Sequence, residues 1–114
     1  MGLPRLDDPL SDEEVDRMMA NATRATEFLK ALAHEGRLMI LCHLASGERS
    51  VTELEQLLAQ RQAAVSQQLA RLRLEGLVEG RREGKTIYYR LADARTRAML
   101  EVVYDLFCAE PPRD

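Results

Sequence analysis

The chain has 114 residues, of which 46% are hydrophobic and 31% are charged, and its formal net charge is −3. This length suits one domain, and the composition is typical of a globular fold rather than a disordered chain. No hydrophobic run approaches the ~20 residues of a transmembrane helix, and the first residues lack the apolar segment of a secretory signal. We therefore expect a cytoplasmic protein without a membrane partner.

Charge is distributed unevenly along the chain. Residues 1–60 carry six basic and 11 acidic side chains, whereas residues 61–97 carry nine basic and four acidic ones. A face that contacts DNA phosphates needs such a local excess of cations, so residues 61–97 are the candidate for nucleic-acid contact. Solvated helix faces whose charges happen to segregate are the alternative explanation.

The first part of the chain predicts two helices. Residues 1–10 contain two prolines and two aspartates and are expected to form a flexible arm. Ser11 and Glu14 have the spacing of a capping box, which predicts a helix from there to about Leu32 with its apolar side chains buried. A second helix is expected from Glu35 to Leu44. We take residues 11–109 as one domain and residues 110–114 as a tail.

Two short apolar stripes follow, and they predict a pair of consecutive helices. The first stripe begins at Val51 and ends at Leu58, and the second runs from Val65 through Leu69 and Leu72 until Gly76 stops it. Small residues, amides and arginines lie opposite the second stripe, as expected of a helix that enters a DNA major groove. These residues are Ser66, Gln67, Ala70, Arg71 and Arg73.

The last third predicts a two-stranded hairpin and a final helix. Residues 78–82 and 86–91 alternate or are β-branched and aromatic, and Glu83-Gly84-Lys85 forms the turn between them. Residues 94–108 form a helix that is apolar on two sides. A small protein with such a helix is expected to bury one side against a partner, which favours a dimer.

Four stretches together are similar to the ArsR/SmtB family of bacterial repressors. They are ALAHEGRLMIL at 31–41, VTEL at 51–54, AVSQQLARLRLEGLV at 64–78 and GKTIYYRL at 84–91. The resemblance implies a mainly α winged helix-turn-helix fold with five helices and a β-hairpin wing. It also implies a homodimer through the first and last helices, which binds an imperfect palindrome in double-stranded DNA and releases it when an inducer acts. An enzyme is not expected.

The family pattern implies which residues contact DNA. Gln62, Ser66, Gln67 and Gln68 would read bases, and Arg71 or Arg73 would contact phosphate. Gln68 departs from the family, in which a histidine is frequent at this place. Gln62 could equally belong to the start of the helix, and Arg90 could be a strand charge that contacts nothing. In the wing, the resemblance assigns Arg81, Arg82, Lys85 and Arg90 to the neighbouring backbone.

Neither metal site common in this family is present in the sequence. Residues 52–56 lack the family's cysteines, and the last helix has Asp93-Ala94-Arg95 without any histidine. Four nitrogen, sulfur or oxygen donors are needed for tetrahedral zinc. We therefore expect no metal and no cofactor. A metal sensor with atypical ligands and a winged-helix protein-interaction module remain the alternatives.

Two cysteines, Cys42 on the second helix and Cys108 on the last, are the candidate sensing residues. Free cysteines often simply pack as small hydrophobes. However, Cys108 lies off the main apolar stripe of its helix, and the BigR/SqrR branch of the family carries cysteines at matching places. The resemblance implies that persulfides or polysulfides bridge Cys42 and Cys108, which lowers operator affinity and derepresses sulfide-responsive genes.

Overall fold

The computed structural model describes residues 9–58 and 62–108, except for the side chains of residues 62 and 63. The chain divides into two units at Lys30 and Ala31. The predicted arm falls mostly outside the described residues, and the predicted tail, 110–114, falls outside them entirely. Each unit is described by itself below.

The first unit is a single helix, α1, which spans Asp12–Leu32 and whose last two residues belong to the second unit. Its start confirms the predicted capping box, because the Ser11 hydroxyl accepts a hydrogen bond from the Glu14 N–H and donates one to the Glu14 carboxylate. The expected burial of its apolar side is absent. Val15, Met18 and Leu29 are exposed, since a lone helix has nothing in its own unit to pack against.

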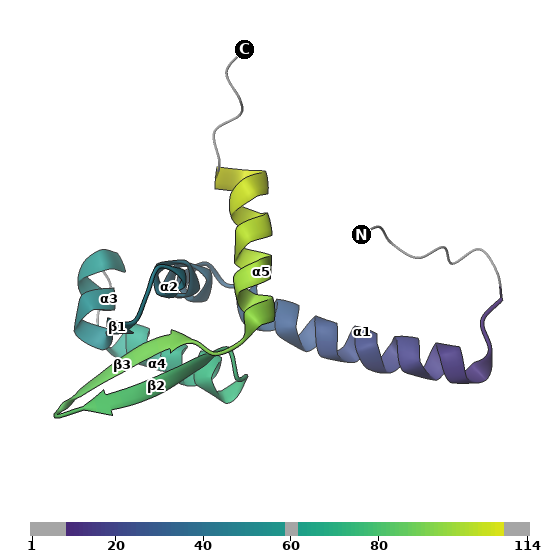
Figure 1. The fold of residues 1–114 in the computed structure, drawn as a ribbon, viewed down its shortest axis with the longest axis horizontal. Coiled ribbons are helices and arrows are strands. Elements are labelled where there is room, and N and C mark those ends of the chain that lie inside the picture. Colours follow the sequence, from purple (N-terminus) through teal and green to yellow (C-terminus); the bar gives the residue numbers. More distant parts are fainter. Residues whose placement is uncertain (1–8, 59–61, 109–114) are drawn as a thin grey trace, which may run out of the picture. The chain divides into compact units, whose positions relative to one another are not determined.

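The second unit is built on three helices, α2 (Glu35–Ala45), α3 (Val51–Leu58) and α4 (Gln62–Leu74). The apolar stripe predicted for residues 65–72 is confirmed, because Val65, Leu69 and Leu72 are almost completely buried. Helix α4 packs against α2, α3 and β2, whose buried residues complete the core. Figure 1 shows the three helices grouped beside the hairpin. The other core residues include Ile40, Leu41, Leu44, Leu54, Leu77 and Val78.

The second unit also contains a three-stranded antiparallel sheet, in the order β1 (Arg49–Ser50), β3 (Thr86–Leu91), β2 (Val78–Glu83), of which β1 lies between α2 and α3 in the chain. Gly84, with φ of +62°, makes the tight turn between β2 and β3. The predicted hairpin is confirmed, but the expectation of only two strands is wrong. Arg49 and Ser50 pair with Tyr89 and Tyr88, and a two-residue strand leaves no alternation in the sequence.

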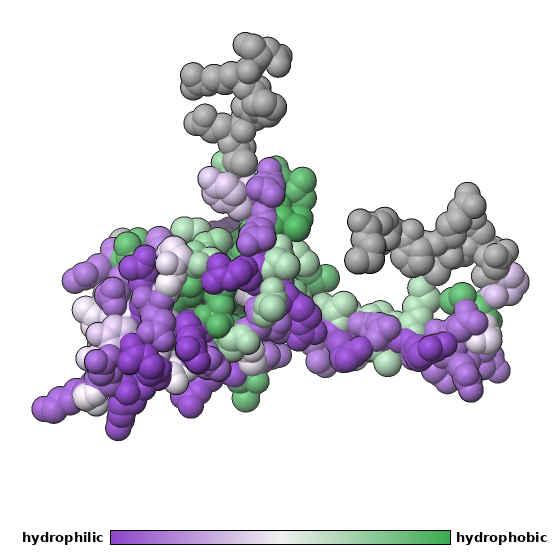
Figure 2. All heavy atoms as spheres, viewed as in Figure 1, coloured by the Kyte–Doolittle hydropathy of each residue, from purple (hydrophilic) through white to green (hydrophobic). Residues whose placement is uncertain are grey.

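The last helix consists of α5 (Ala94–Val103) and a π-helical turn over Tyr104–Cys108, so the expected uninterrupted α-helix over 94–108 is only partly found. Asp93 caps it by accepting a hydrogen bond from the Arg95 N–H at 2.8 Å. Hydrophobic side chains gather along one side of this helix in Figure 2. Leu106 and Phe107 of the π-helical turn are 72% and 81% exposed. No helix among the described residues is long and apolar enough to cross a membrane.

Candidate functional site

Helix α4 presents a slim polar face to solvent. Ser66, Gln67, Ala70 and Arg73 are exposed on the side opposite the buried Val65 stripe. Gly76 ends the segment because its φ of +77° lies in the left-handed region that side chains disfavour. A helix with short side chains on its free face can approach base edges closely. Gln62 is the first residue of α4, but its side chain lies outside the described residues.

Gln68 does not lie on this exposed face. Its amide occupies the space that a side chain at Gly36 of α2 would fill, since a Cβ built on Gly36 would lie 2.3 Å from Gln68 Nε2. The Gln68 Oε1 atom is buried and has no hydrogen-bond partner among the described residues. The structure therefore directs the Gln68 amide toward α2 and away from the exposed face of α4.

A groove of about 450 Å³ lies beside the polar face of α4 and is lined by Ser66, Ala70, Arg73, Leu74 and Tyr89. Arg73 is exposed, whereas the Arg71 guanidinium pairs with Glu75 at 3.2 Å. Tyr89 of β3, which sequence reasoning missed as a site residue, also lines this groove. Its partner across the hairpin is Gly80, which has no side chain and therefore leaves room for the Tyr89 ring. This glycine was the signal in the sequence that could have indicated the position of the ring.

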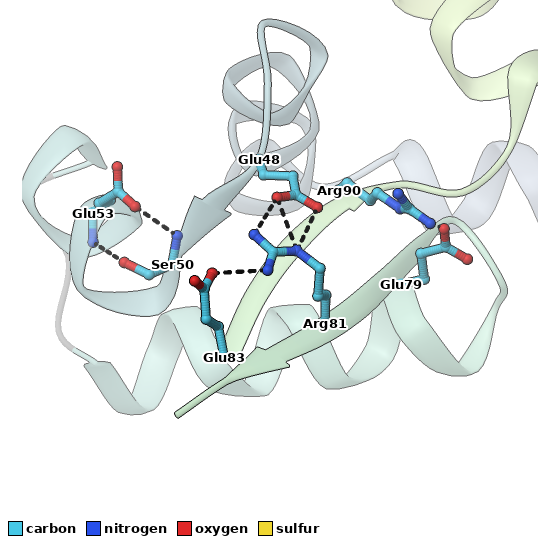
Figure 3. A network of polar contacts seen from close by, with 7 residues as sticks. All are labelled: Glu48, Ser50, Glu53, Glu79, Arg81, Glu83 and Arg90. Atoms are coloured by element: carbon cyan, nitrogen blue, oxygen red, sulfur yellow. Dashed lines mark hydrogen bonds and ion pairs between the residues drawn. The ribbon is translucent and has the colours of Figure 1, made fainter. Parts of the chain in front are cut away.

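The wing arginine Arg81 is held by two carboxylates (Figure 3). Its Nη2 atom lies 2.8 Å from Glu48 Oε2, and its Nη1 atom lies 2.8 Å from Glu83 Oε2. The guanidinium also stands 5.1 Å from the centre of the Tyr88 ring. Its hydrogen bonds to Glu48 hold the pKa of that carboxyl below its ordinary value. Arg81 therefore joins the wing to the residue that precedes β1.

The other wing cations differ in their partners. Arg90 pairs with Glu79 across the β2–β3 hairpin, as Figure 3 shows. Arg82 and Lys85 are exposed, and neither has a carboxylate partner among the residues that the structure describes. Of the four cations predicted to contact DNA from the wing, these two remain available for phosphate without breaking an ion pair.

Ser50 connects the sheet to the helix-turn-helix. It pairs with Tyr88 in the β1–β3 ladder, and its hydroxyl accepts a hydrogen bond from the Glu53 N–H at 3.1 Å. Glu53 returns the contact by accepting from the Ser50 N–H at 3.0 Å (Figure 3). This is a second capping box, and it fixes where α3 begins.

The two cysteines are free and exposed, one on α2 and the other at the end of the π-helical turn. Partial burial raises the pKa of the Cys42 thiol, and the charge of Cys108 raises it further. Helix α2 packs on α5, and Tyr104 and Asp105, which belong to the same turn as Cys108, line one groove together with Cys42. Neither thiol has the buried position expected of a residue that only fills the core.

Cys42 opens into a groove of about 420 Å³ between α2 and the last helix. Ala45 lines it from α2, and Arg97, Glu101 and Asp105 line it from the last helix. The described residues contain no group of three or more His, Cys, Asp or Glu side chains placed to hold a metal ion. His34, one of the two histidines, instead caps α2 by accepting a hydrogen bond from the Arg37 N–H through Nδ1.

Three helices over a small sheet with a protruding hairpin define a winged helix-turn-helix protein. The family model described as bacterial regulatory protein, arsR family, matches residues 34–80. The biofilm growth-associated repressor of Agrobacterium fabrum (strain C58) is 47% identical over 91% of this chain and 91% of its own length. The transcriptional activator HlyU of Vibrio cholerae is 42% identical over 88% of this chain and 90% of its own length. The chain belongs to the arsR family and is therefore a transcriptional regulator rather than an enzyme.

Solved structures agree with this assignment. Reduced HlyU from Vibrio cholerae is 44% identical and gives a TM-score of 0.78 over 82% of this chain and 98% of that one. The transcriptional repressor BigR from Xylella fastidiosa is 40% identical, with a TM-score of 0.74 over 89% and 100%. The homodimeric winged helix-turn-helix DNA-binding domain Mb0332 from Mycobacterium bovis is 35% identical, with a TM-score of 0.71 over 85% and 86%.

Proposed function

We propose that this regulator is a homodimeric DNA-binding repressor that releases its operator when reactive sulfur species bridge Cys42 and Cys108. One observation carries the proposal. The exposed Cys42 lines a groove together with Tyr104 and Asp105 of the turn that ends at the exposed Cys108, although 66 positions of sequence separate the two cysteines. Two relatives are called repressors, which supports repression rather than activation by this protein, although HlyU is called an activator.

The DNA-binding part of the proposal rests on α4 and the wing. The exposed face of α4 offers Ser66 and Gln67 to base edges, while Arg73, Arg82 and Lys85 are cations free to contact phosphate. The assignment of Mb0332 as a DNA-binding domain supports this reading. Arg71, Arg81 and Arg90 would contact phosphate only by sharing or losing their present carboxylate partners.

The homodimer rests on unpaired apolar surfaces. Val102, Leu106 and Phe107 are more than half exposed on the last helix, and α1 carries exposed Met18 and Met19. Burying such side chains against a second copy is favourable at about 25 cal/mol per Å² of apolar surface. A twofold-symmetric molecule would then place its two α4 helices about one DNA turn apart, roughly 34–36 Å, over a palindromic operator.

The proposed switch is a sequence of sulfur exchanges. The Cys42 thiolate attacks the outer sulfur of a persulfide, RSSH, the S–S bond of the donor breaks, and RS⁻ leaves and takes up a proton. The Cys108 thiolate then attacks the Cys42 sulfur and expels HS⁻, which leaves a disulfide. The dithiol has lost two electrons and two protons, and the donor has been reduced to RSH and H₂S.

Longer bridges follow if both cysteines first become persulfides. The Cys108 persulfide anion attacks the Cys42 sulfur of Cys42–S–SH and expels HS⁻, which gives a trisulfide. A disulfide requires Cα atoms no more than about 7 Å apart, and each added sulfur extends the reach by roughly 2 Å. We therefore expect persulfide donors to close a bridge that peroxide closes poorly.

Bridging couples the sensor to the DNA-binding elements. A link from Cys42 to Cys108 ties α2, which packs on α4, to the helix proposed for dimerisation. A coupling free energy of about 1–3 kcal/mol would lower operator affinity roughly 5- to 150-fold. That range is sufficient for derepression of sulfide-responsive genes.

The test is operator binding by fluorescence anisotropy with the reduced protein, repeated after persulfide, peroxide and zinc. We expect release after persulfide, weak or no release after peroxide, and none after zinc. Cys42→Ser and Cys108→Ser should each bind DNA as the reduced protein does and remain bound after persulfide. A single-cysteine variant that released DNA normally would refute the dithiol switch, and release by zinc would favour a metal sensor.

A further inference from the structure

We propose that the groove beside Cys42 recognises the α-amino acid head of the persulfide donor, so that the regulator discriminates among persulfides by noncovalent binding. Arg97 would hold the donor's carboxylate, and Glu101 with Asp105 would hold its ammonium group. The inferred inducer class is a small zwitterionic persulfide, of which cysteine persulfide is the simplest member. This inference rests on the proposed function and adds a specificity site to it.

The groove has the size and the lining that such a ligand needs. Its volume of about 420 Å³ lies within the roughly 300–1,000 Å³ of small-molecule sites. Cys42 lies at its wall beside the largely apolar side chains of Leu100 and Tyr104, and the remaining lining side chains contribute one positive charge (Arg97) and two negative charges (Glu101 and Asp105). A ligand that carries both charges next to a reactive sulfur matches this lining better than a simple anion does.

The charges in the groove do not neutralise one another. Arg97 and Glu101 stand four residues apart on α5, the spacing at which opposite charges normally pair. Arg97 instead donates a hydrogen bond from Nη1 to the Ala45 carbonyl oxygen at 2.9 Å. Ala45 ends α2, where the helix dipole favours a cation. None of the ion pairs among the described residues involves Arg97, Glu101 or Asp105.

Arg97 is not placed to activate the thiol. A cation held against a cysteine lowers its pKa, whereas burial and Cys108 raise the pKa of Cys42. Arg97 uses Nη1 for the Ala45 carbonyl, which leaves its other guanidinium nitrogens for a ligand, and the reaction at Cys42 gains from holding the donor in place. With its head group bound, the donor presents its outer sulfur to Cys42, and the exchange proceeds as written above.

The groove is also separate from the surface proposed for dimerisation. Arg97, Glu101 and Asp105 recur every four residues and line the groove together. Val102 and Leu106 each follow one position later, about 100° further round the helix, and carry the exposed apolar surface. The recognition residues can therefore be changed without altering the apolar surface.

The test measures persulfidation of Cys42 in the full-length dimeric Cys108→Ser chain, in which the bridge cannot close. Rates are followed by mass spectrometry with persulfides of cysteine, N-acetylcysteine and cysteamine and with hydrogen disulfide. Each rate is divided by that of the same donor with 2-mercaptoethanol. We expect a corrected rate for cysteine persulfide about fivefold above the others, as expected of a partly exposed ion pair worth roughly 1 kcal/mol.

Three variants in the Cys108→Ser background separate the two charges of the head group. Arg97→Gln should remove the advantage of cysteine persulfide over the cysteamine donor, which lacks the carboxylate, and Arg97→Lys should keep part of it. Glu101→Gln should reduce the advantage over the N-acetyl donor, which lacks the ammonium group. Arg95→Gln is the matched control, because Arg95 is exposed on the same helix and pairs with Asp93 outside the groove.

Two results would overturn the recognition site without touching the switch. One is equal corrected rates for all four donors, and the other is a donor preference that Arg97→Gln leaves unchanged. Failure of every donor to modify Cys42 would instead overturn the proposed function, and the recognition site with it.

Discussion

Helix α4 and the wing, which is the β2–β3 hairpin, lie in the same basic segment, but they present their charges differently. On α4 the exposed face is formed by short polar side chains and the unpaired Arg73. On the wing, Arg81 and Arg90 are held by carboxylates, and only Arg82 and Lys85 are unpaired among the described residues. A count of basic residues therefore overstates what the wing can offer to phosphate, and we expect contact with bases to come from α4.

The largest effect is expected from a charge placed on the α4 face. Ser66→Glu should lower operator affinity about 100-fold or more, because a carboxylate against the DNA polyanion costs several kcal/mol. Fluorescence anisotropy measures the loss, and circular dichroism checks the fold. Gln56→Glu adds the same charge to an exposed position of α3 and should cost much less. Equal losses in both variants would show that total charge, rather than the α4 face, controls binding.

A smaller effect is expected from the unpaired wing cation. Arg82→Gln should weaken operator binding about tenfold at low salt and reduce the slope of log K against log salt by about two, since a dimer loses two phosphate contacts. Arg90→Gln is the matched control, because Arg90 already pairs with Glu79. Identical changes in slope for the two variants would contradict the contrast between paired and unpaired arginines.

A change that releases a paired arginine should act in the opposite direction. Glu48→Gln removes one carboxylate that holds Arg81, so we expect operator binding at low salt to tighten about threefold and the gain to vanish as salt screens it. Glu55→Gln on α3 removes the same charge away from Arg81 and should change affinity less. Weaker binding by Glu48→Gln would mean that the ion pair between Arg81 and Glu48 stabilises the wing in the position that binds DNA.

The smallest effect on DNA affinity is expected at Gln68. Gln68→Met replaces a buried amide whose oxygen has no partner with an apolar side chain of similar shape. We expect a gain of about 1 kcal/mol in the free energy of unfolding, because an unsatisfied buried polar group costs about 1–3 kcal/mol. Denaturant titration measures the gain, and operator affinity should stay within about twofold. A tenfold loss of affinity would restore Gln68 as a base-reading residue.

Local signals were sufficient to predict most of the fold. The capping box at Ser11, the apolar stripe from Val65 to Leu72 and the stop at Gly76 each depend on residues within one helix. The strand at Arg49–Ser50 was missed because its pairing with Tyr88 and Tyr89 depends on residues nearly 40 positions away. A two-residue strand has too few positions for a periodic pattern.

The candidate site was less predictable, because it depends on contacts between elements. Sequence reasoning placed Gln68 beside Gln67 on the exposed polar face of α4. Its amide turns toward α2 instead, because Gly36 has no side chain to fill that space. Likewise, Arg81 meets Glu48 across 33 positions of sequence. The placement of the two cysteines on the second and the last helix, in contrast, was indicated by the family resemblance.

The shared role of Ser50 limits how the molecule can respond to a signal. This residue closes the β1–β3 ladder and also caps α3, so tilting the hairpin would cost the first turn of that helix. We therefore expect each protomer to keep its own shape when a signal acts. For the same reason, we expect the proposed bridge to lower DNA affinity by changing the spacing of the two protomers rather than the shape of either one.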